Sequence, residues 1–542
     1  MTDDEVFARV DETRRRVEAR PLPESVGALI ERAAAQHGDR RVCLFFEDGV
    51  ELTYARLDER SNRLADALVR LGARKGTHVG VMLPNVAEFP ITWIAIAKLG
   101  AVMVPINTGY TGRELSYVVN DSDAQFLVID ESCVPALDAM PDRPAILSDG
   151  HVIVRGAGGG GARRSWQELG ESGRPGFRSP QPVTGSDLLS IQYTSGTTGF
   201  PKGCMLSHRY WLILGQSVSM TDDPPARNIL VAQPFYYMDP QWLLLMAAFA
   251  GGAVYVAGRA SASRFMEWVR TYAIEYCIFP EVVTKQPPSP RDADNALRRV
   301  NIFGFGKEAH LAAEQRFHIV AREAFGMTEI GPGLFMPAEA THMVGSGSCG
   351  LPGPYRRCKI TDEHGQEVPR GEIGELCVTG DSILWGYYKK PAANAAAFRG
   401  EWFRTGDLFR QDEPGYFYLV GRLKDMIRRS GENISARDVE AVLRSIPEVA
   451  EAAVVPVPDE YRKEEVKAYL VLQPGIRRDA LPPEQVIDFC LQRLARFKVP
   501  RYIEYIDELP KTPSQKIAKP QLVALKRDLR EGSYDRVDGV WR

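Results

Sequence analysis

The sequence lacks the cysteine spacings of a disulfide-rich or zinc-binding protein. Its eight cysteines are scattered along 542 residues, and no C-x-x-C pair occurs. Neither a disulfide framework nor a structural zinc site is therefore expected, and a reducing compartment suits these thiols. The sequence also has no H-E-x-x-H motif and no G-x-S-x-G nucleophile elbow. These absences argue against a zinc hydrolase and against a covalent serine enzyme.

Long apolar runs and a surplus of positive charge are also missing. The longest apolar region, 91–105, is interrupted by Lys98. It is shorter than the roughly 20 residues of a membrane helix, so we expect a buried helix followed by a strand and no membrane span. The acidic start of the chain resembles no secretory signal, which predicts a cytoplasmic protein. The net charge of -3 gives no overall basic field, so nucleic acid is not an expected partner.

The chain of 542 residues is long enough for more than one domain. Short β-branched runs alternate with helical patterns from about residue 78 to about residue 280, which predicts parallel sheets covered by helices. Glycine-punctuated strands between 345 and 419 indicate a β-rich subdomain. We predict an α/β fold with a large N-terminal domain, 1–421, that includes this subdomain, a hinge at 422–425, and a small mobile α+β C-terminal domain, 426–542.

A dense cluster of hydroxyls and glycines with one lysine occupies residues 193–203, with the sequence YTSGTTGFPKG. It follows an apolar strand and precedes an expected helix over 206–220. Glycines let successive N–H groups turn toward one anion, hydroxyls add donors, and Lys202 neutralises charge, so the segment predicts a phosphate-binding loop. It is not a Walker A motif, because position 201 is proline and position 203 is glycine.

Four further motifs follow in order: FGMTE at 325–329, TGD at 405–407, GRLKDMI at 421–427 and LPKTPSQKI at 509–517. Together with the loop at 193–203, they resemble the signatures of the adenylate-forming, or AMP-binding, superfamily. Within it the chain is similar to the branch of acyl-CoA synthetases and carboxylate–CoA ligases, in which the carnitine and crotonobetaine CoA ligases are one candidate group.

The resemblance implies ATP, Mg²⁺ and coenzyme A as cofactors, and it assigns a role to each motif. Thr328 meets ATP, Glu329 is the Mg²⁺ ligand, Asp407 accepts hydrogen bonds from the ribose hydroxyls with Arg422 nearby, Lys424 is the hinge, and Lys516 is the adenylation lysine. A lysine suits that last position because it offsets the repulsion between the carboxylate and the α-phosphate. The predicted catalytic residues are Lys516, Glu329 and Thr194. The loop residues expected to bind the phosphates are Thr194, Ser195, Gly196, Thr197, Thr198, Gly199 and Lys202.

The same resemblance predicts an acyl pocket with an aromatic wall. Tyr237 stands where many acyl-CoA ligases have a histidine, and Gln515 replaces the glycine that commonly precedes the adenylation lysine. Rings of this kind, together with the carboxylate of Asp239, also suit a cationic acid such as a betaine. The predicted lining residues are Tyr236, Tyr237, Met238, Trp242, Gly304, Phe305, Gly306, Met327 and Gly331.

These features predict ATP-dependent activation of a small carboxylic acid to acyl-AMP with release of pyrophosphate, followed by thioester formation with coenzyme A. Two alternatives stay open at this stage. The acyl group could instead pass to a carrier-protein thiol or to an amine, or the chain could be a non-catalytic nucleotide-binding protein. Retention of both Glu329 and Lys516 argues against the second, because binding AMP alone requires neither. The oligomeric state is also left open, with a homodimer as one alternative.

Overall fold

The structure is a computed structural model that describes residues 1–157, 161–194, 201–429, 432–512 and 516–542. Two compact units are present: the first comprises Met1–Thr194, Pro201–Cys358 and Val378–Phe403, and the second comprises Lys359–Cys377 and Arg404–Arg542. The predicted domain boundary at residue 421 and the predicted hinge stay predictions, because a division into compact units describes packing and does not describe motion. Among the described helices, none combines the length and the apolar character needed to cross a membrane.

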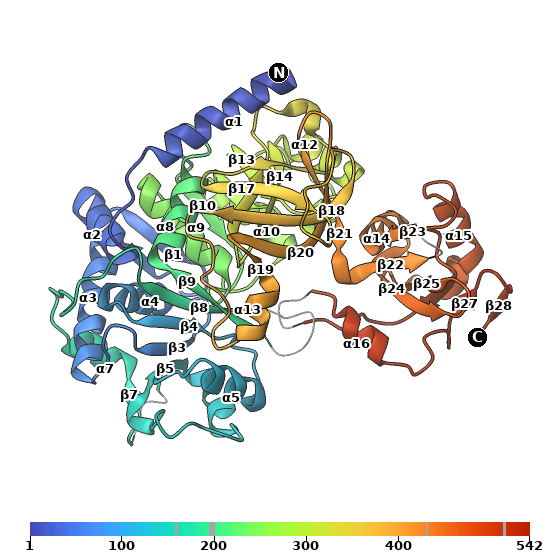
Figure 1. Cartoon of the computed structure of the whole chain (residues 1–542). Coiled ribbons are helices and arrows are strands. Elements are labelled where there is room, and N and C mark those ends of the chain that lie inside the picture. Colours follow the sequence, from blue (N-terminus) through green and yellow to red (C-terminus); the bar gives the residue numbers. More distant parts are fainter. Residues whose placement is uncertain (158–160, 195–200, 430–431, 513–515) are drawn as a thin grey trace. The chain divides into compact units, whose positions relative to one another are not determined.

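The first unit contains a sheet that carries the predicted phosphate-binding loop (Figure 1). Its order is β7-β6-β5-β3-β4-β8-β9, and all neighbours are parallel except β8 and β9. The apolar region 91–105 supplies a helix and the central strand β4, as predicted. The strands are β3 (His78–Met82), β4 (Val102–Pro105), β5 (Phe126–Asp130), β6 (Val152–Arg155), β7 (Arg164–Ser165), β8 (Leu188–Thr194) and β9 (Lys202–Ser207).

A second sheet of the first unit runs in the order β16-β15-β14-β13-β12-β10-β11-β1-β2. Neighbours from β14 to β1 are parallel, and the outer pairs are antiparallel. The predicted alternation of strands and helices is thereby confirmed. The strands are β1 (Arg41–Phe45), β2 (Glu51–Thr53), β10 (Asn228–Val231), β11 (Ala253–Val256), β12 (Tyr276–Ile278), β13 (Arg299–Ile302), β14 (Ala321–Met327), β15 (Gly331–Phe335) and β16 (Ser348–Pro352).

Helices cover these sheets and bury their apolar faces. Even the charged Lys98 of the apolar α4 is buried, and its ammonium donates to Asp58 Oδ1 at 2.6 Å and to Asn62 Oδ1 at 2.6 Å. The helices of the first unit are α1 (Asp3–Glu18), α2 (Val26–His37), α3 (Tyr54–Arg70), α4 (Glu88–Leu99), α5 (Gly112–Asp121), α6 (Val134–Asp138), α7 (Trp166–Ser172), α8 (His208–Ser219), α9 (Met238–Ala250), α10 (Ala262–Thr271), α11 (Glu281–Thr284), α12 (Lys307–Phe317) and α13 (Pro391–Ala397).

The helix expected over 206–220 begins later than predicted. Residues Lys202–Ser207 form strand β9, and α8 starts at His208 with Ser207 as its N-cap. The register of β9 pairs Thr194 with Lys202. The phosphate-binding loop therefore connects two antiparallel strands and does not lead into a helix.

The C-terminal part of the second unit is a separate α+β domain, which confirms the predicted fold class. Its sheet has the order β23-β22-β25-β26-β27-β28, with β24 paired to β25. A buried core that includes Val439, Val454 and Ile503 joins this sheet to its helices. The elements are β22 (Met426–Arg429), β23 (Glu432–Ser435), α14 (Ala436–Arg444), β24 (Val449–Asp459), β25 (Lys463–Leu472), α15 (Pro483–Leu491), β26 (Tyr502–Tyr505), α16 (Lys519–Ala524), β27 (Tyr534–Asp535) and β28 (Val540–Trp541).

Five strands precede this domain, in the region that was predicted to be β-rich. They are β17 (Arg356–Thr361), β18 (Ile373–Gly380), β19 (Phe398–Arg399), β20 (Trp402–Gln411) and β21 (Phe417–Arg422). Strands β20 and β21 are antiparallel and pair Asp407 with Arg422.

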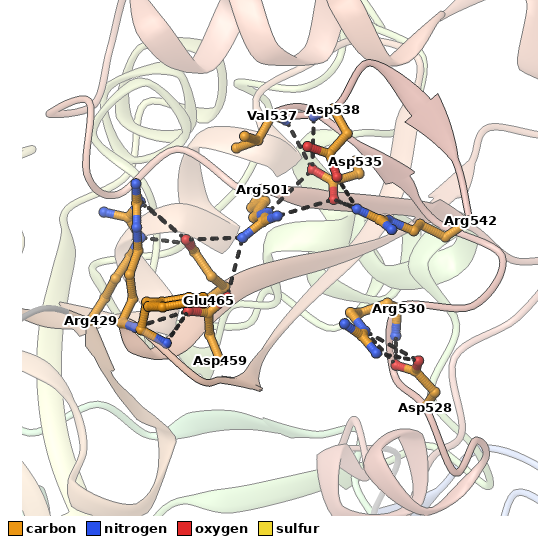
Figure 2. A network of polar contacts seen from close by, with 12 residues as sticks. Arg429, Asp459, Glu465, Arg501, Asp528, Arg530, Asp535, Val537, Asp538 and Arg542 are labelled. Atoms are coloured by element: carbon orange, nitrogen blue, oxygen red, sulfur yellow. Dashed lines mark hydrogen bonds and ion pairs between the residues drawn. The ribbon is translucent and has the colours of Figure 1, made fainter.

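The last residues of the chain are held by buried charge (Figure 2). Asp535 on β27 is fully buried and accepts hydrogen bonds from Arg501 Nε at 3.2 Å and from Arg542 Nη2 at 2.7 Å. Burial acts to raise the pKa of Asp535, but these arginines outweigh it and hold the pKa below its usual range. Arg501 also pairs with Glu465, which accepts from Arg429 Nε at 2.6 Å. One ion network therefore links the terminal hairpin to β22.

Replacing Asp535 with asparagine is expected to destabilise this domain. The substitution leaves two arginines facing a neutral amide at a buried site, which should lower the free energy of unfolding by about 2–3 kcal/mol. Calorimetry of the unfolding transition measures the loss. The matched control is Asp528→Asn in the exposed Asp528–Arg530 pair, which should cost less than about 0.5 kcal/mol. Equal losses in the two variants would contradict a special role for Asp535.

The first unit should lose stability in mild acid because of His208. Burial lowers the pKa of His208 from 6.5 to about 4. Its Nδ1 accepts a hydrogen bond from the backbone N–H of Val26 at 3.2 Å, and its Nε2 has no hydrogen-bond partner among the described residues. Since the unfolded chain takes up a proton first as the pH falls, stability is lost between the unfolded and the folded pKa.

We expect the free energy of unfolding of the wild type to fall by about 2 kcal/mol more than that of His208→Asn between about pH 7 and about pH 5. Urea unfolding followed by tryptophan fluorescence measures this difference. Parallel losses in the two proteins would show that another group titrates.

Candidate functional site

Both ends of the predicted phosphate-binding loop are tied to helix α5. The hydroxyl of Tyr193 donates to Asp121 Oδ2 at 2.8 Å, and the hydroxyl of Tyr117 donates to the carbonyl of Pro201 at 2.8 Å. The hydroxyl of Thr194 donates to the carbonyl of Lys202 at 3.4 Å. Thr194 and Lys202 therefore face each other across a braced hairpin. The predicted phosphate ligands Ser195, Gly196, Thr197, Thr198 and Gly199 lie outside the described residues.

The predicted nucleotide element around Glu329 is the turn between β14 and β15. The hydroxyl of Tyr210 donates to the carbonyl of Thr328 at 2.9 Å, and the guanidinium of Arg356 donates to the carbonyl of Ile330 at 2.7 Å. Glu329 is only 6% exposed, and its Oε1 accepts a hydrogen bond from the hydroxyl of Tyr387 at 2.9 Å. Each of the three turn residues is thus held by a different segment of the chain, and the carboxylate has a defined orientation.

Lys202 lies beside the same tyrosine. Its ammonium is 3.9 Å from the centre of the Tyr387 ring, close enough for a cation–π contact. The structure therefore brings together two predicted residues, Lys202 and Glu329, that are far apart in the sequence. Sequence reasoning missed Tyr387, which belongs to none of the five motifs. The aromatic segment Trp385–Tyr388 is the one local signal that could have drawn attention to it.

The buried cation of Arg356 was also missed. It lies behind the turn and donates to backbone carbonyls, including that of Asp381 at 2.8 Å, and burial lowers its pKa. A side chain at Gly331 would come within 3.4 Å of both Arg356 Nη2 and the hydroxyl of Tyr210. This distance is ordinary van der Waals contact, so it is the φ of +68° that favours glycine at this position.

Seven of the nine predicted acyl-pocket residues lie at one edge of the second sheet; Trp242 lies within α9, and Gly331 begins β15. Strands β10, β13 and β14 run parallel, and the predicted residues follow or end these strands. Because the carboxyl ends of parallel strands meet at the same edge, residues 236–238, 304–306 and 327 share that edge. The backbone N–H groups of Gly304 and Phe305 both donate to the carboxylate of Glu323, at 3.0 and 2.9 Å, which fixes one turn of this edge.

Aromatic side chains form the part of this edge that follows β10. The rings of Tyr236 and Tyr237 are 4.7 Å apart in an edge-to-face arrangement, and Asn107 Nδ2 donates to the hydroxyl of Tyr237 at 3.2 Å. Burial raises the pKa of Tyr237, so its hydroxyl stays protonated at neutral pH. The indole N–H of Trp242 donates to Asp239 Oδ1 at 2.9 Å. Tyr237, which stands where many acyl-CoA ligases have a histidine, therefore supplies a fixed neutral hydroxyl and no imidazole.

The predicted ribose-binding residues come together within the second unit. Asp407 is 4% exposed, and Arg422 Nε donates to its Oδ1 at 3.0 Å. The backbone N–H of Asp407 donates to the hydroxyl of Thr405 at 3.1 Å. The arginine charge and this local turn hold the carboxylate in place, and a carboxylate suits the predicted role because its oxygens accept hydrogen bonds from hydroxyls.

Lys516 lies on a loop that closes on itself. The backbone N–H of Thr512 donates to the carbonyl of Lys516 at 2.7 Å, and Lys511 and Ile517 form a bridge. The side chain of Lys516 is exposed, which is compatible with its predicted role. Gln515 and the side chain of Lys424 lie outside the part of the chain that is described.

Comparison with known proteins agrees with these motifs. The AMP-binding enzyme model matches residues 30–388, and the model for the AMP-binding enzyme C-terminal domain matches residues 438–516. A crotonobetaine/carnitine–CoA ligase of Proteus mirabilis (strain HI4320) is 32% identical over 513 residues, which cover 89% of this chain and 96% of the relative.

Solved structures lead to the same family. An anthranilate CoA ligase in complex with anthranoyl-AMP has a TM-score of 0.82 at 25% identity, over 94% of this chain and 98% of the other. An o-succinylbenzoate CoA synthetase from Bacillus subtilis, in complex with its acyl-adenylate intermediate, has a TM-score of 0.77 at 25% identity, over 95% and 100% of the two chains. The chain therefore belongs to the AMP-binding enzyme family.

Proposed function

We propose that this protein is an AMP-forming acid–CoA ligase. It activates a carboxylic acid with ATP as acyl-AMP, releases pyrophosphate, and transfers the acyl group to the thiol of coenzyme A. The observation that supports this function best is the contact of Tyr387 with both Lys202 and Glu329, because it holds the proposed phosphate-binding cation and a buried carboxylate on one tyrosine. The similarity to CoA ligases over nearly the whole chain supports the choice of acceptor.

In the first half-reaction, a carboxylate oxygen of the acid attacks the α-phosphorus of ATP, and the bond to the bridging oxygen of pyrophosphate breaks. Lys202, Thr194 and the rest of the loop bind the leaving phosphates. Lys516 offsets the repulsion between the two reacting anions, mostly in the transition state. Asp407, fixed by Arg422, holds the ribose.

Glu329 is proposed as the protein ligand of Mg²⁺, with Thr328 beside it at the nucleotide. Mg²⁺ is usually bound by one or two carboxylates and completed by phosphate oxygens and water. The described residues contain no group of three or more histidine, cysteine or acidic side chains that could hold a metal alone. One oriented carboxylate near the phosphate loop fits an ion of this kind, which would neutralise charge on the leaving pyrophosphate.

In the second half-reaction, the thiol sulfur attacks the acyl carbon, the bond from that carbon to the AMP oxygen breaks, and the thiol proton is released. We propose that the C-terminal domain turns about the hinge at Lys424 between the two steps and withdraws Lys516. We also propose a cytoplasmic location, where the eight scattered cysteines would stay reduced.

We further propose a small acid with a cationic group as the substrate, in line with the named substrate of the similar Proteus ligase. The ring faces of Tyr236 and Tyr237 and the carboxylate of Asp239 lie on one short segment at the pocket edge. Such groups attract quaternary ammonium ions.

The test is mass spectrometry of the products formed from ATP, coenzyme A and a panel of acids. The panel pairs a trimethylammonium acid with a neutral isostere in which carbon replaces the nitrogen. We expect kcat/KM for the cationic acid to exceed that of the isostere by about tenfold or more. Preference for the isostere would reject the substrate proposal. Acyl-AMP that is transferred only to an added amine or carrier protein would reject coenzyme A as the acceptor.

A further inference from the structure

The segment that carries Tyr387 connects two parts of the proposed active site through its backbone. The carbonyl of Gly203 accepts from the N–H of Tyr388 at 2.8 Å, and the carbonyl of Met205 accepts from the N–H of Trp385 at 3.0 Å, so the segment runs along β9. At its other end, the N–H of Leu384 donates to the carbonyl of Glu329 at 2.8 Å. The segment is therefore fixed to both the phosphate-loop strand and the Glu329 turn.

The side chain of Tyr387 makes the same connection a second time. It is 4% exposed, its hydroxyl donates to Glu329 Oε1, and its ring lies under the ammonium of Lys202. A hydrogen bond to a charged acceptor is stronger than one between neutral groups, and it restricts rotation of the carboxylate. These contacts form one series from the Glu329 carboxylate through the hydroxyl and ring of Tyr387 to the Lys202 ammonium. Each contact polarises the groups of the next contact and thereby strengthens it.

We propose that Tyr387 is a positioning residue for adenylation, which sets the carboxylate of Glu329 and the ammonium of Lys202 relative to each other. This inference rests on the proposed function and deepens it. The hydroxyl acts on the metal ligand, and the ring acts on the phosphate ligand. The two actions can be separated, because Tyr387→Phe removes the hydroxyl and keeps a ring, whereas Tyr387→Leu removes both.

The experiment measures ATP binding by calorimetry, in Mg²⁺ and in EDTA, together with the Mg²⁺ dependence of pyrophosphate release. For Tyr387→Phe we expect the Mg²⁺ concentration at half-maximal rate to rise about tenfold, while the Kd of ATP in EDTA changes less than about twofold. For Tyr387→Leu we expect the Kd of ATP in EDTA to rise about tenfold as well, since Lys202 loses its ring.

Tyr388→Phe is the matched control. It removes the neighbouring hydroxyl, which donates to Asp123 Oδ2 at 2.8 Å, and leaves the backbone pairing with β9 unchanged. We expect this variant to bind ATP and Mg²⁺ like the wild type. Equal effects of Tyr387→Phe and Tyr388→Phe would indicate loss of general packing and overturn the proposal.

A double-mutant cycle keeps the proposal falsifiable if Tyr387→Leu does not fold. In the Glu329→Gln background, Tyr387→Phe should change the Kd of ATP in Mg²⁺ by less than about twofold, because the charged acceptor is already gone. Full additivity of the two substitutions would overturn the proposal, as would a Tyr387→Phe variant with the wild-type Mg²⁺ dependence. Absence of acid-dependent pyrophosphate release from the wild type would instead reject the proposed function, while the binding data would still report on Tyr387.

Discussion

Lys516→Ala is expected to slow acyl-AMP formation by about 10²- to 10³-fold, equivalent to roughly 3–4 kcal/mol of transition-state stabilisation. The lysine offsets a repulsion that exists only while the carboxylate approaches the α-phosphate. Once acyl-AMP is present, that repulsion no longer has to be overcome. Thiolysis of acyl-AMP added from outside should therefore stay within about twofold of the wild type. Stopped-flow measurement of the two half-reactions separates these effects.

The matched control is Lys511→Ala on the same loop. Lys511 is exposed, and its ammonium pairs with the carboxylate of Glu451 at 2.5 Å. We expect both half-reactions to change by less than about threefold in this variant, in keeping with the small contribution of surface ion pairs. An equal loss of both half-reactions in Lys516→Ala would contradict the role assigned to Lys516.

Glu329→Gln is expected to lower the rate of pyrophosphate release by about a hundredfold at saturating Mg²⁺, by analogy with other lost electrostatic groups. The glutamine retains the shape of the side chain and an oxygen that can accept from Tyr387, but it has no charge to bind a cation. In EDTA the same substitution should tighten ATP binding, since it removes a negative charge beside the polyphosphate. Calorimetry of ATP binding measures the sign of the change in affinity in Mg²⁺ and in EDTA.

Glu339→Gln serves as the control for this charge removal, because Glu339 is exposed and pairs with Arg9 on the surface. It should leave ATP binding unchanged in either buffer. A Glu329→Gln variant with weaker ATP binding to the same degree in Mg²⁺ and in EDTA would show that Glu329 acts on the nucleotide directly and not through a metal ion.

The predictions that succeeded depend on local patterns. The strands expected over 101–106, 125–129 and 276–279 lie within a residue or two of β4, β5 and β12. In the C-terminal domain the expected order of helix, two strands, helix and strand is correct from α14 to β26, but β22 and β23, which precede α14, were not predicted. The five motifs are continuous in sequence, so the residues within each are recognised together. Pairing of Asp407 with Arg422 was also foreseeable, because both motifs suggested the ribose as a common partner.

The features that were missed depend on contacts between distant segments. Tyr387 and Glu329 are 58 positions apart in the sequence, and nothing in either local pattern indicates their hydrogen bond. The expected helix began at residue 206, but Leu206 and Ser207 are the last residues of β9, because both pair with residues of β8 that lie more than ten positions earlier in the chain. The terminal hairpin of β27 and β28 was not predicted, since strands as short as these take their conformation from Asp535 and its buried ion pairs.

The buried groups around the proposed nucleotide site also argue against a protein that only binds AMP. Burial of the Glu329 carboxylate costs free energy unless it is hydrogen-bonded, and the chain provides Tyr387 for this purpose. The loop stems are braced in the same way by Tyr117 and by Tyr193 with Asp121. Such fixed polar groups suit a site that must stabilise charge as it develops.

The most direct test of the central claim is a measurement of pyrophosphate and AMP released by the purified wild-type protein with ATP, Mg²⁺ and a panel of carboxylic acids, with and without coenzyme A. The account predicts that pyrophosphate appears only when a suitable acid is present, and that the acid is recovered as its CoA thioester only when coenzyme A is added. Failure of every acid to release pyrophosphate, or cleavage of ATP to ADP and phosphate, would contradict it.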